Sequence, residues 1–289
     1  MYLVSGLQRI DGRRGDTREV SVLIYIGVDL AWKMAPDPDE KRTALVSLDE
    51  EGTVLEYREC SGDNEIVEAC LRMGPGECTL GIDAPLVVPA ETARIRDCEL
   101  ALMRMGIRVF PTNPTRFRRW YGGCRGVAIL EKLRALGSGY ELVAELPSRA
   151  QRAVVEVYPT ASWMKIFGER PRFKNVPLSV KRDALMRLHE MLEDRLPSGY
   201  PRVELGPLRH EINELKAMSG AQLDHHGDAL DAVMAAYTVL LWRSDPSLCE
   251  VVGTLERGFI VVPKAPGTRD RERLDGKERE PRHRSSRPP

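Results

Sequence analysis

Short apolar runs alternate with stretches of helical periodicity along most of the chain. Runs rich in Val, Ile and Leu predict strands, and the first three are close enough in sequence to form a meander. The turn Asp49-Glu50-Glu51-Gly52 joins the second and third of them, as in a hairpin. The predicted strands cover residues 22–29, 43–48, 53–59, 79–83, 153–158 and 259–262.

Helical spacing of apolar residues fills most of the chain between and after these strands. It predicts helices over residues 64–72, 91–105, 127–136, 160–167, 178–195, 207–219 and 224–243. A meander that leads into strands joined by helices is typical of a mixed sheet with helices on both faces. We therefore expect one α/β domain over residues 21–263, with a helical insertion around residues 106–150.

Both ends of the chain are polar. We expect residues 1–20 to be a flexible extension. Residues 264–289 contain nine Lys or Arg, five Asp or Glu and four prolines, which predicts a disordered basic tail. The tail has two interpretations, a solubilising extension or a tether for nucleic acid.

Composition narrows the class of protein. Lys plus Arg and Asp plus Glu both number 43, so only local clusters of charge can argue for nucleic acid. There is no apolar run of about 20 residues for a membrane helix and no signal-peptide core, so we expect a cytoplasmic protein. The six cysteines form no C-x-x-C pair, which argues against a cysteine zinc site. Oligomeric state is left open.

Four carboxylates occupy special places in this pattern. Asp29 and Asp83 end two predicted strands, Glu156 lies among apolar strand residues, and Asp228 lies near the start of the last long helix. A buried carboxylate is costly unless it is paired or binds a metal. Because strand ends meet at one edge of an open sheet, we predict that these four side chains are catalytic and bind one or two Mg²⁺ or Mn²⁺ ions.

The last long helix offers further ligands. Asp224 lies one turn before Asp228, on the same helix face, so we include it among the metal ligands. Asp231 is either another ligand or a solvated side chain. His225 and His226 are either a polar helix start or groups for a softer metal or general base catalysis.

Basic residues surround the predicted acids in the sequence. Residues 100–130 contain six arginines and no Asp or Glu, with four aromatic residues interleaved. This segment is either a surface that stacks on single-stranded or distorted nucleic acid or an insertion whose aromatic side chains are buried. The candidate substrate-binding residues are Arg96, Arg116, Arg118, Arg119 and Lys174.

Four motifs together carry a resemblance to a known family. They are Gly27-Val28-Asp29, Gly81-Ile82-Asp83-Ala84-Pro85-Leu86, Glu156-Val157-Tyr158-Pro159 and Gly227-Asp228-Ala229-Leu230-Asp231-Ala232. In this order, over about residues 22–263, they resemble an uncharacterised family of predicted nucleases with an RNase H-like fold. The Asp228 helix is also similar to the closing helix of Holliday-junction resolvases. The resemblance implies an RNase H-like mixed five-stranded sheet, and metal ligation by Asp29, by Asp83 or Glu156, and by Asp228.

The leading hypothesis is a metal-dependent nuclease that hydrolyses phosphodiester bonds of DNA or RNA. One alternative is a nucleic-acid-binding domain of the same fold without catalytic activity. Another is a phosphotransferase of the related actin-like fold, which needs a glycine-rich phosphate loop after the first aspartate. Leu30-Ala31-Trp32 supplies no such loop, so we rank this alternative last.

Overall fold

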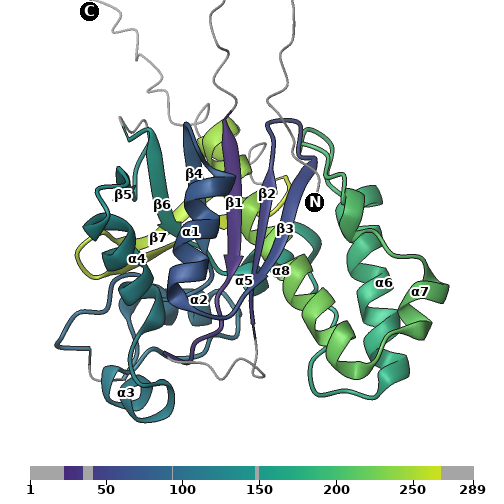
Figure 1. Cartoon of the computed structure of the whole chain (residues 1–289), viewed down its shortest axis with the longest axis horizontal. Coiled ribbons are helices and arrows are strands. Elements are labelled where there is room, and N and C mark those ends of the chain that lie inside the picture. The colour runs from purple at the N-terminus through teal and green to yellow at the C-terminus, as the bar shows by residue number, and fades with distance from the viewer. Residues whose placement is uncertain (1–22, 35–41, 93, 147–149, 268–289) are drawn as a thin grey trace, which may run out of the picture.

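The computed structural model describes residues 23–34, 42–92, 94–146 and 150–267. These residues form a six-stranded sheet, a separate two-stranded sheet and helices around them (Figure 1). The strands are β1 (Ile24–Asp29), β2 (Thr43–Leu48), β3 (Val54–Cys60), β4 (Cys78–Ile82), β5 (Tyr140–Leu142), β6 (Arg152–Glu156), β7 (Cys249–Thr254) and β8 (Gly258–Pro263). The helices are α1 (Asp63–Met73), α2 (Asp97–Arg104), α3 (Pro114–Tyr121), α4 (Arg125–Ala135), α5 (Pro159–Phe167), α6 (Leu178–Asp194), α7 (Ile212–Ala217) and α8 (Gly220–Ser244).

The large sheet has the order β3-β2-β1-β4-β6-β5. Strands β1, β2 and β3 form an antiparallel meander, whereas β4 runs parallel to β1 and β6 runs parallel to β4. The predicted mixed α/β architecture is confirmed. The predicted count of five strands is wrong, because the segment expected as an insertion also contributes β5, which pairs in parallel with β6. With only three residues, β5 has no recognisable pattern of its own.

Local sequence signals explain where several helices begin and end. The Ser219 hydroxyl caps α8 by accepting a hydrogen bond from the Gln222 amide, and Asn113 caps α3 in the same way. Pro159 occupies the first turn of α5, and Gly168 ends this helix with a left-handed φ of 75°. The C-terminal strands β7 and β8 form a hairpin that α2 covers.

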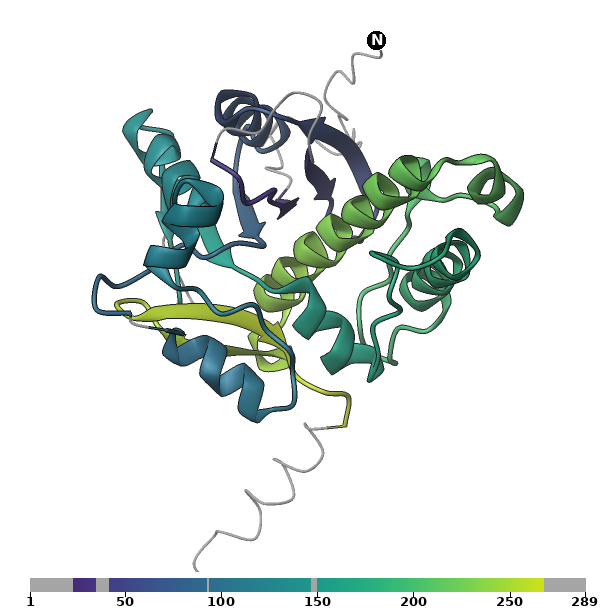
Figure 2. The same ribbon diagram turned by 90° about the horizontal axis from the view of Figure 1, so that it is seen from below.

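Each face of the large sheet has its own core. Alternate residues such as Ile26 and Val28 of β1 pack with α1 and α4 on one face. The other face packs against α8, which crosses the middle of the molecule (Figure 2). Gly27 permits this contact, because a β-carbon there would lie 2.0 Å from the carbonyl oxygen of Ala232.

Helices α6 and α7 lie to one side of the sheet and pack near the N-terminal half of α8 (Figure 1). No helix within the described ranges is long and apolar enough to cross a membrane. The predicted N-terminal extension and nearly all of the predicted basic tail, from residue 268 onward, lie outside the described residues.

Candidate active site at the strand ends

Asp29 and Asp83 lie side by side at one edge of the large sheet. Val28 of β1 is paired with Ile82 of β4, and the Asp83 amide donates to the Val28 carbonyl oxygen at 2.9 Å. Side chains alternate along a strand, and Gly27 and Gly81 both face α8. Asp29 and Asp83, two residues further along each chain segment, therefore belong to the α8 face.

Helix α8 brings Asp228 to the same edge. Asp228 precedes Ala232 by one turn, and Ala232 is the residue that contacts Gly27. Asp228 is 3% exposed and Asp29 is 7% exposed. Three aspartates from two adjacent strand ends and one helix therefore meet at the carboxyl end of the sheet.

The Lys174 side chain forms ion pairs with two of these aspartates. Its Nζ lies 2.5 Å from Asp228 Oδ1 and 4.0 Å from Asp29 Oδ2. The neighbouring Phe173 is buried against Gly227, where a β-carbon would lie 2.1 Å from the Phe173 ring. Burial opposes the charge of Lys174, but the carboxylates around it raise the pKa of Lys174 above its usual value.

Asp231 completes the cluster and is buried rather than solvated. Trp163 Nε1 donates to its Oδ1 at 3.0 Å, and Arg170 Nη2 donates to its Oδ2 at 2.5 Å. Burial opposes the charge of Arg170, and the Asp231 carboxylate raises the pKa of this guanidinium. Arg170 is a residue that sequence reasoning missed, because it lies in a loop with no pattern that links it to α8.

The electrostatics of the cluster are most visible at Asp83. Burial raises the pKa of Asp83 well above its usual range, and the charges of Asp29 and Asp231 raise it further. Lys174 and Arg170 act in the opposite direction but do not cancel the increase. An additional positive charge at this edge would therefore favour the ionised form of Asp83.

A divalent cation fits this donor set in ligand type and in charge, because hard cations prefer carboxylate oxygens. The side chains are not preassembled around an ion. Among the described residues, no group of three or more His, Cys, Asp or Glu side chains is arranged closely enough to hold one. Lys174 instead supplies positive charge beside Asp228 and Asp29, so it is the group that an ion would displace.

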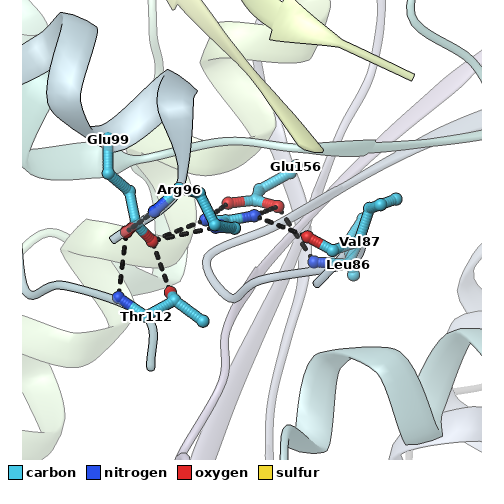
Figure 3. A network of polar contacts seen from close by, with 6 residues as sticks. All are labelled: Leu86, Val87, Arg96, Glu99, Thr112 and Glu156. Atoms are coloured by element: carbon cyan, nitrogen blue, oxygen red, sulfur yellow. Dashed lines mark hydrogen bonds and ion pairs between the residues drawn. The ribbon is translucent and has the colours of Figure 1, made fainter. Parts of the chain in front are cut away.

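The structure does not place Glu156 with these aspartates. Val154 of β6 packs on the α1 and α4 face and Val155 on the α8 face, so alternation places Glu156 opposite to Asp83. There the Arg96 guanidinium donates to both Glu156 oxygens, at 2.8 and 2.5 Å, and the Leu86 amide donates at 2.9 Å (Figure 3). Burial raises the pKa of Glu156, and Arg96 opposes that increase.

Arg96 is likewise bonded to groups within the protein. Its Nε donates to Glu99 at 2.9 Å, and Glu99 also accepts hydrogen bonds from Thr112 (Figure 3). The Arg96 side chain is 2% exposed, so it is neither the predicted phosphate contact nor part of a solvated face. Sequence could not show this, because the distant partners of Arg96 are Glu156 at the end of β6 and the Val87 carbonyl oxygen in the loop after β4.

Asp224 also lies outside the cluster. It is four residues before Asp228, and α8 carries it toward α6, where it pairs with Lys181 Nζ at 2.6 Å. His225 lies 3.5 Å from Glu59. His226 is buried, with its Nε2 2.7 Å from His189 Nε2.

The predicted arginines Arg116, Arg118 and Arg119 are exposed on α3. The aromatic residues of this segment are not all buried, since Phe117 is buried whereas Trp120 is 53% exposed. The Arg116 guanidinium lies over the Trp120 ring at 5.0 Å from its centroid.

No curated protein and no solved structure matches the chain. A family model described as a protein of unknown function (DUF429) matches residues 27–252. These residues include the strand ends and all of α8, so the chain belongs to the DUF429 family.

Proposed function

We propose that the chain is a metal-dependent nuclease with an RNase H-like fold that hydrolyses phosphodiester bonds of DNA or RNA. The supporting observation is the meeting of Asp29, Asp83 and Asp228 at one sheet edge, where the charge of Asp29 helps to raise the pKa of Asp83. An antiparallel meander followed by parallel strands, with a long helix across one face, agrees with that fold.

In this proposal Asp29, Asp83 and Asp228 hold one or two Mg²⁺ or Mn²⁺ ions. The chemistry that such ions supply when bound is activation of a water molecule and stabilisation of charge on the phosphate. Lys174, released from Asp228, contacts a phosphate oxygen of the substrate. Asp231 acts as a positioning residue, because its bonds to Trp163 and Arg170 fix the segment before Lys174 relative to α8.

The actin-like phosphotransferase is supported less well. In such enzymes a glycine-rich loop after the first aspartate approaches the phosphates. Here Leu30 and Ala31 follow Asp29, and both are buried. The Ala31 amide donates to Thr43 Oγ1 at 3.1 Å, so this amide is already used within the protein.

The test is cleavage of labelled single-stranded, duplex, hybrid and branched substrates in Mn²⁺, by the wild type and by Asp29→Asn and Asp228→Asn. We expect both substitutions to reduce the cleavage rate by roughly 100-fold or more while substrate binding is kept. Asp224→Asn is the matched control, since it removes a carboxylate from the same helix outside the cluster and should change the rate less than about twofold.

Two outcomes would contradict the proposal. Undiminished cleavage by Asp29→Asn and Asp228→Asn would show that the acid cluster is not the active site. Binding of nucleic acid without cleavage of any substrate by the wild type would favour the non-catalytic alternative.

A further inference from the structure

A small cavity opens beside Asp83, on the side of the sheet edge that faces α3. Its volume is about 140 Å³, well below the roughly 300–1,000 Å³ typical of pockets for drug-sized ligands. Trp32, Pro85, Phe110 and Tyr158 contribute to its lining, and Asp83 belongs to the same lining. The cavity is therefore suited to one flat ring that extends from a ligand at the acid cluster.

Aromatic rings continue from this cavity to the surface. The rings of Trp32 and Phe110 have centroids 5.1 Å apart, and those of Phe110 and Trp120 have centroids 6.4 Å apart. Phe110 is 38% exposed and Trp120 is 53% exposed. Exposed aromatic rings beside arginines on α3 are the combination that binds unpaired nucleotides, through stacking and phosphate contacts.

Apart from Asp83, the polar side chains in the lining already have partners inside the protein. Arg96 is bonded to Glu156 and Glu99, and Thr112 donates to Glu99 (Figure 3). The Tyr158 hydroxyl donates to the Arg108 carbonyl oxygen at 2.8 Å. A ring in the cavity would therefore be recognised by its faces more than by the hydrogen-bonding groups on its edge.

We propose that this cavity is a base pocket, which takes one unpaired nucleobase of the substrate against Trp32 and Phe110. The flanking phosphate then lies at Asp83, and the adjoining backbone follows the arginines of α3. This inference rests on the proposed function for the chemical class of the ligand and deepens it. The substrate has an unpaired nucleotide next to the cleaved bond, because a base in an intact duplex is stacked on both faces and would first have to be flipped out of the helix.

The test compares binding of single-stranded oligonucleotides with and without bases, in EDTA so that metal-dependent cleavage does not interfere. The probes are fluorescent oligonucleotides of about 15 thymidines and a matched abasic oligonucleotide of the same length. The full-length chain carries Phe110→Leu or Trp32→Leu, with Leu136→Ala as the control, because Leu136 is 63% exposed at the end of α4. Thermal unfolding establishes that each variant is folded. If Trp32→Leu is not folded, the test uses Phe110→Leu alone.

We expect either aromatic substitution to weaken binding of the thymidine oligonucleotide by roughly 5- to 100-fold, which is the loss of one stacked base. Binding of the abasic oligonucleotide should not change, and oligonucleotides of thymidine, cytidine and adenosine should bind within about threefold of one another. Equal losses for the base-containing and abasic probes would overturn the base pocket.

The failure of this inference is distinguishable from failure of the proposed function. If binding of the base-containing probe depends on Phe110 but no substrate is cleaved, the base pocket is supported and the proposed nuclease activity is contradicted. If cleavage depends on Asp29 and Asp228 but the wild type binds both probes equally, the proposed nuclease activity is supported and the base pocket is contradicted.

Discussion

Asp83 is the residue at which the charge of the candidate site is least balanced. Its carboxyl group is partly buried beside Asp29 and Asp231, and these surroundings hold its pKa well above the usual range. The folded chain therefore binds a proton at this position more tightly than the unfolded chain does. By linkage, this group reduces stability as pH rises above the unfolded value of about 4.

We predict that Asp83→Asn is more stable than the wild type at pH 7, because the substitution removes a carboxylate that is difficult to ionise in the folded chain. The difference should disappear near pH 4, where Asp83 of the wild type is protonated in the folded state. Urea unfolding at the two pH values measures it. Asp97→Asn, an exposed aspartate on α2, should not produce this pattern. A variant less stable than the wild type at pH 7 would contradict the assigned electrostatics.

His189 of α6 and His226 of α8 form a buried pair. Burial, together with the charge of neighbouring histidines, lowers the pKa of His189 to about 4 and that of His226 to about 3. Arg209 also acts to lower the pKa of His189. The unfolded chain binds more protons than the folded chain below the ordinary value of about 6.5, so stability is lost as pH falls from there.

Between pH 7 and pH 5 each of these histidines should contribute a loss on the order of 1–2 kcal/mol in the free energy of unfolding. Urea unfolding of His226→Gln should show a shallower pH dependence than the wild type. His225→Gln is the control, since His225 is the adjacent residue on α8 and its side chain is 39% exposed. Equal pH dependence for the wild type and His226→Gln would contradict a neutral buried pair.

At the scale of elements, the site depends on how closely α8 approaches the sheet. Gly27 of β1 and Gly81 of β4 leave space that the α8 backbone and Val239 fill. The contact of Gly27 with Ala232 fixes the position of Asp228, which lies one helical turn before Ala232 and so comes close to the end of β1. Small residues therefore place a catalytic candidate that lies about 200 positions later in the sequence.

We predict that Gly27→Ala lowers the free energy of unfolding by roughly 3 kcal/mol or more, because the new methyl group would collide with backbone atoms of α8. Gly76→Ala is the matched control, since nothing lies within 4 Å of a β-carbon built there. Its effect should stay within about 1 kcal/mol. Urea unfolding measures both. Wild-type stability of Gly27→Ala would mean that α8 does not pack directly on β1.

The sequence predicts where the strands end but not which face of the sheet each side chain lies on. The apolar runs before Asp29 and Asp83 stop at a carboxylate, and such a boundary is visible without coordinates. Glu156 lies in an equally apolar run, but the side chains of a strand alternate between faces, so a displacement of one residue moves a side chain to the other face. Its pairing with Arg96 depends on the packing of α2 against β8, which no local pattern encodes.

Helix α8 shows the same limit. Asp224 and Asp231 both lie about one turn from Asp228, so helical spacing alone does not choose between them. The direction in which α8 crosses the sheet decides, because it carries Asp231 toward Trp163 and Asp224 toward Lys181. That direction is a tertiary property. It follows from the glycines of β1 and β4 only once the strand order is known.

At the scale of the whole molecule, equal numbers of acidic and basic residues conceal an uneven distribution. The carboxyl end of β1 points down in the middle of Figure 1, with α3 at the lower left and α6 and α7 at the right. A nucleic-acid backbone that reaches the acid cluster from the side of α3 would pass the arginines of that helix. Net charge cannot report this arrangement, but the salt dependence of binding can.

We predict that a variant with Arg116→Gln, Arg118→Gln and Arg119→Gln binds single-stranded oligonucleotides with a weaker salt dependence. Each lost phosphate contact reduces the slope of log K against log salt by about 0.7, so the slope should fall by roughly 2. Fluorescence anisotropy between about 50 and 200 mM salt measures it. The control replaces Arg202, Arg209 and Lys216, which are exposed in the segment from residue 202 to residue 216, and makes the same change in net charge. Equal reductions of the slope in both variants would mean that binding depends on total charge. A binding surface formed by α3 requires a larger reduction of the slope in the variant with Arg116, Arg118 and Arg119 replaced.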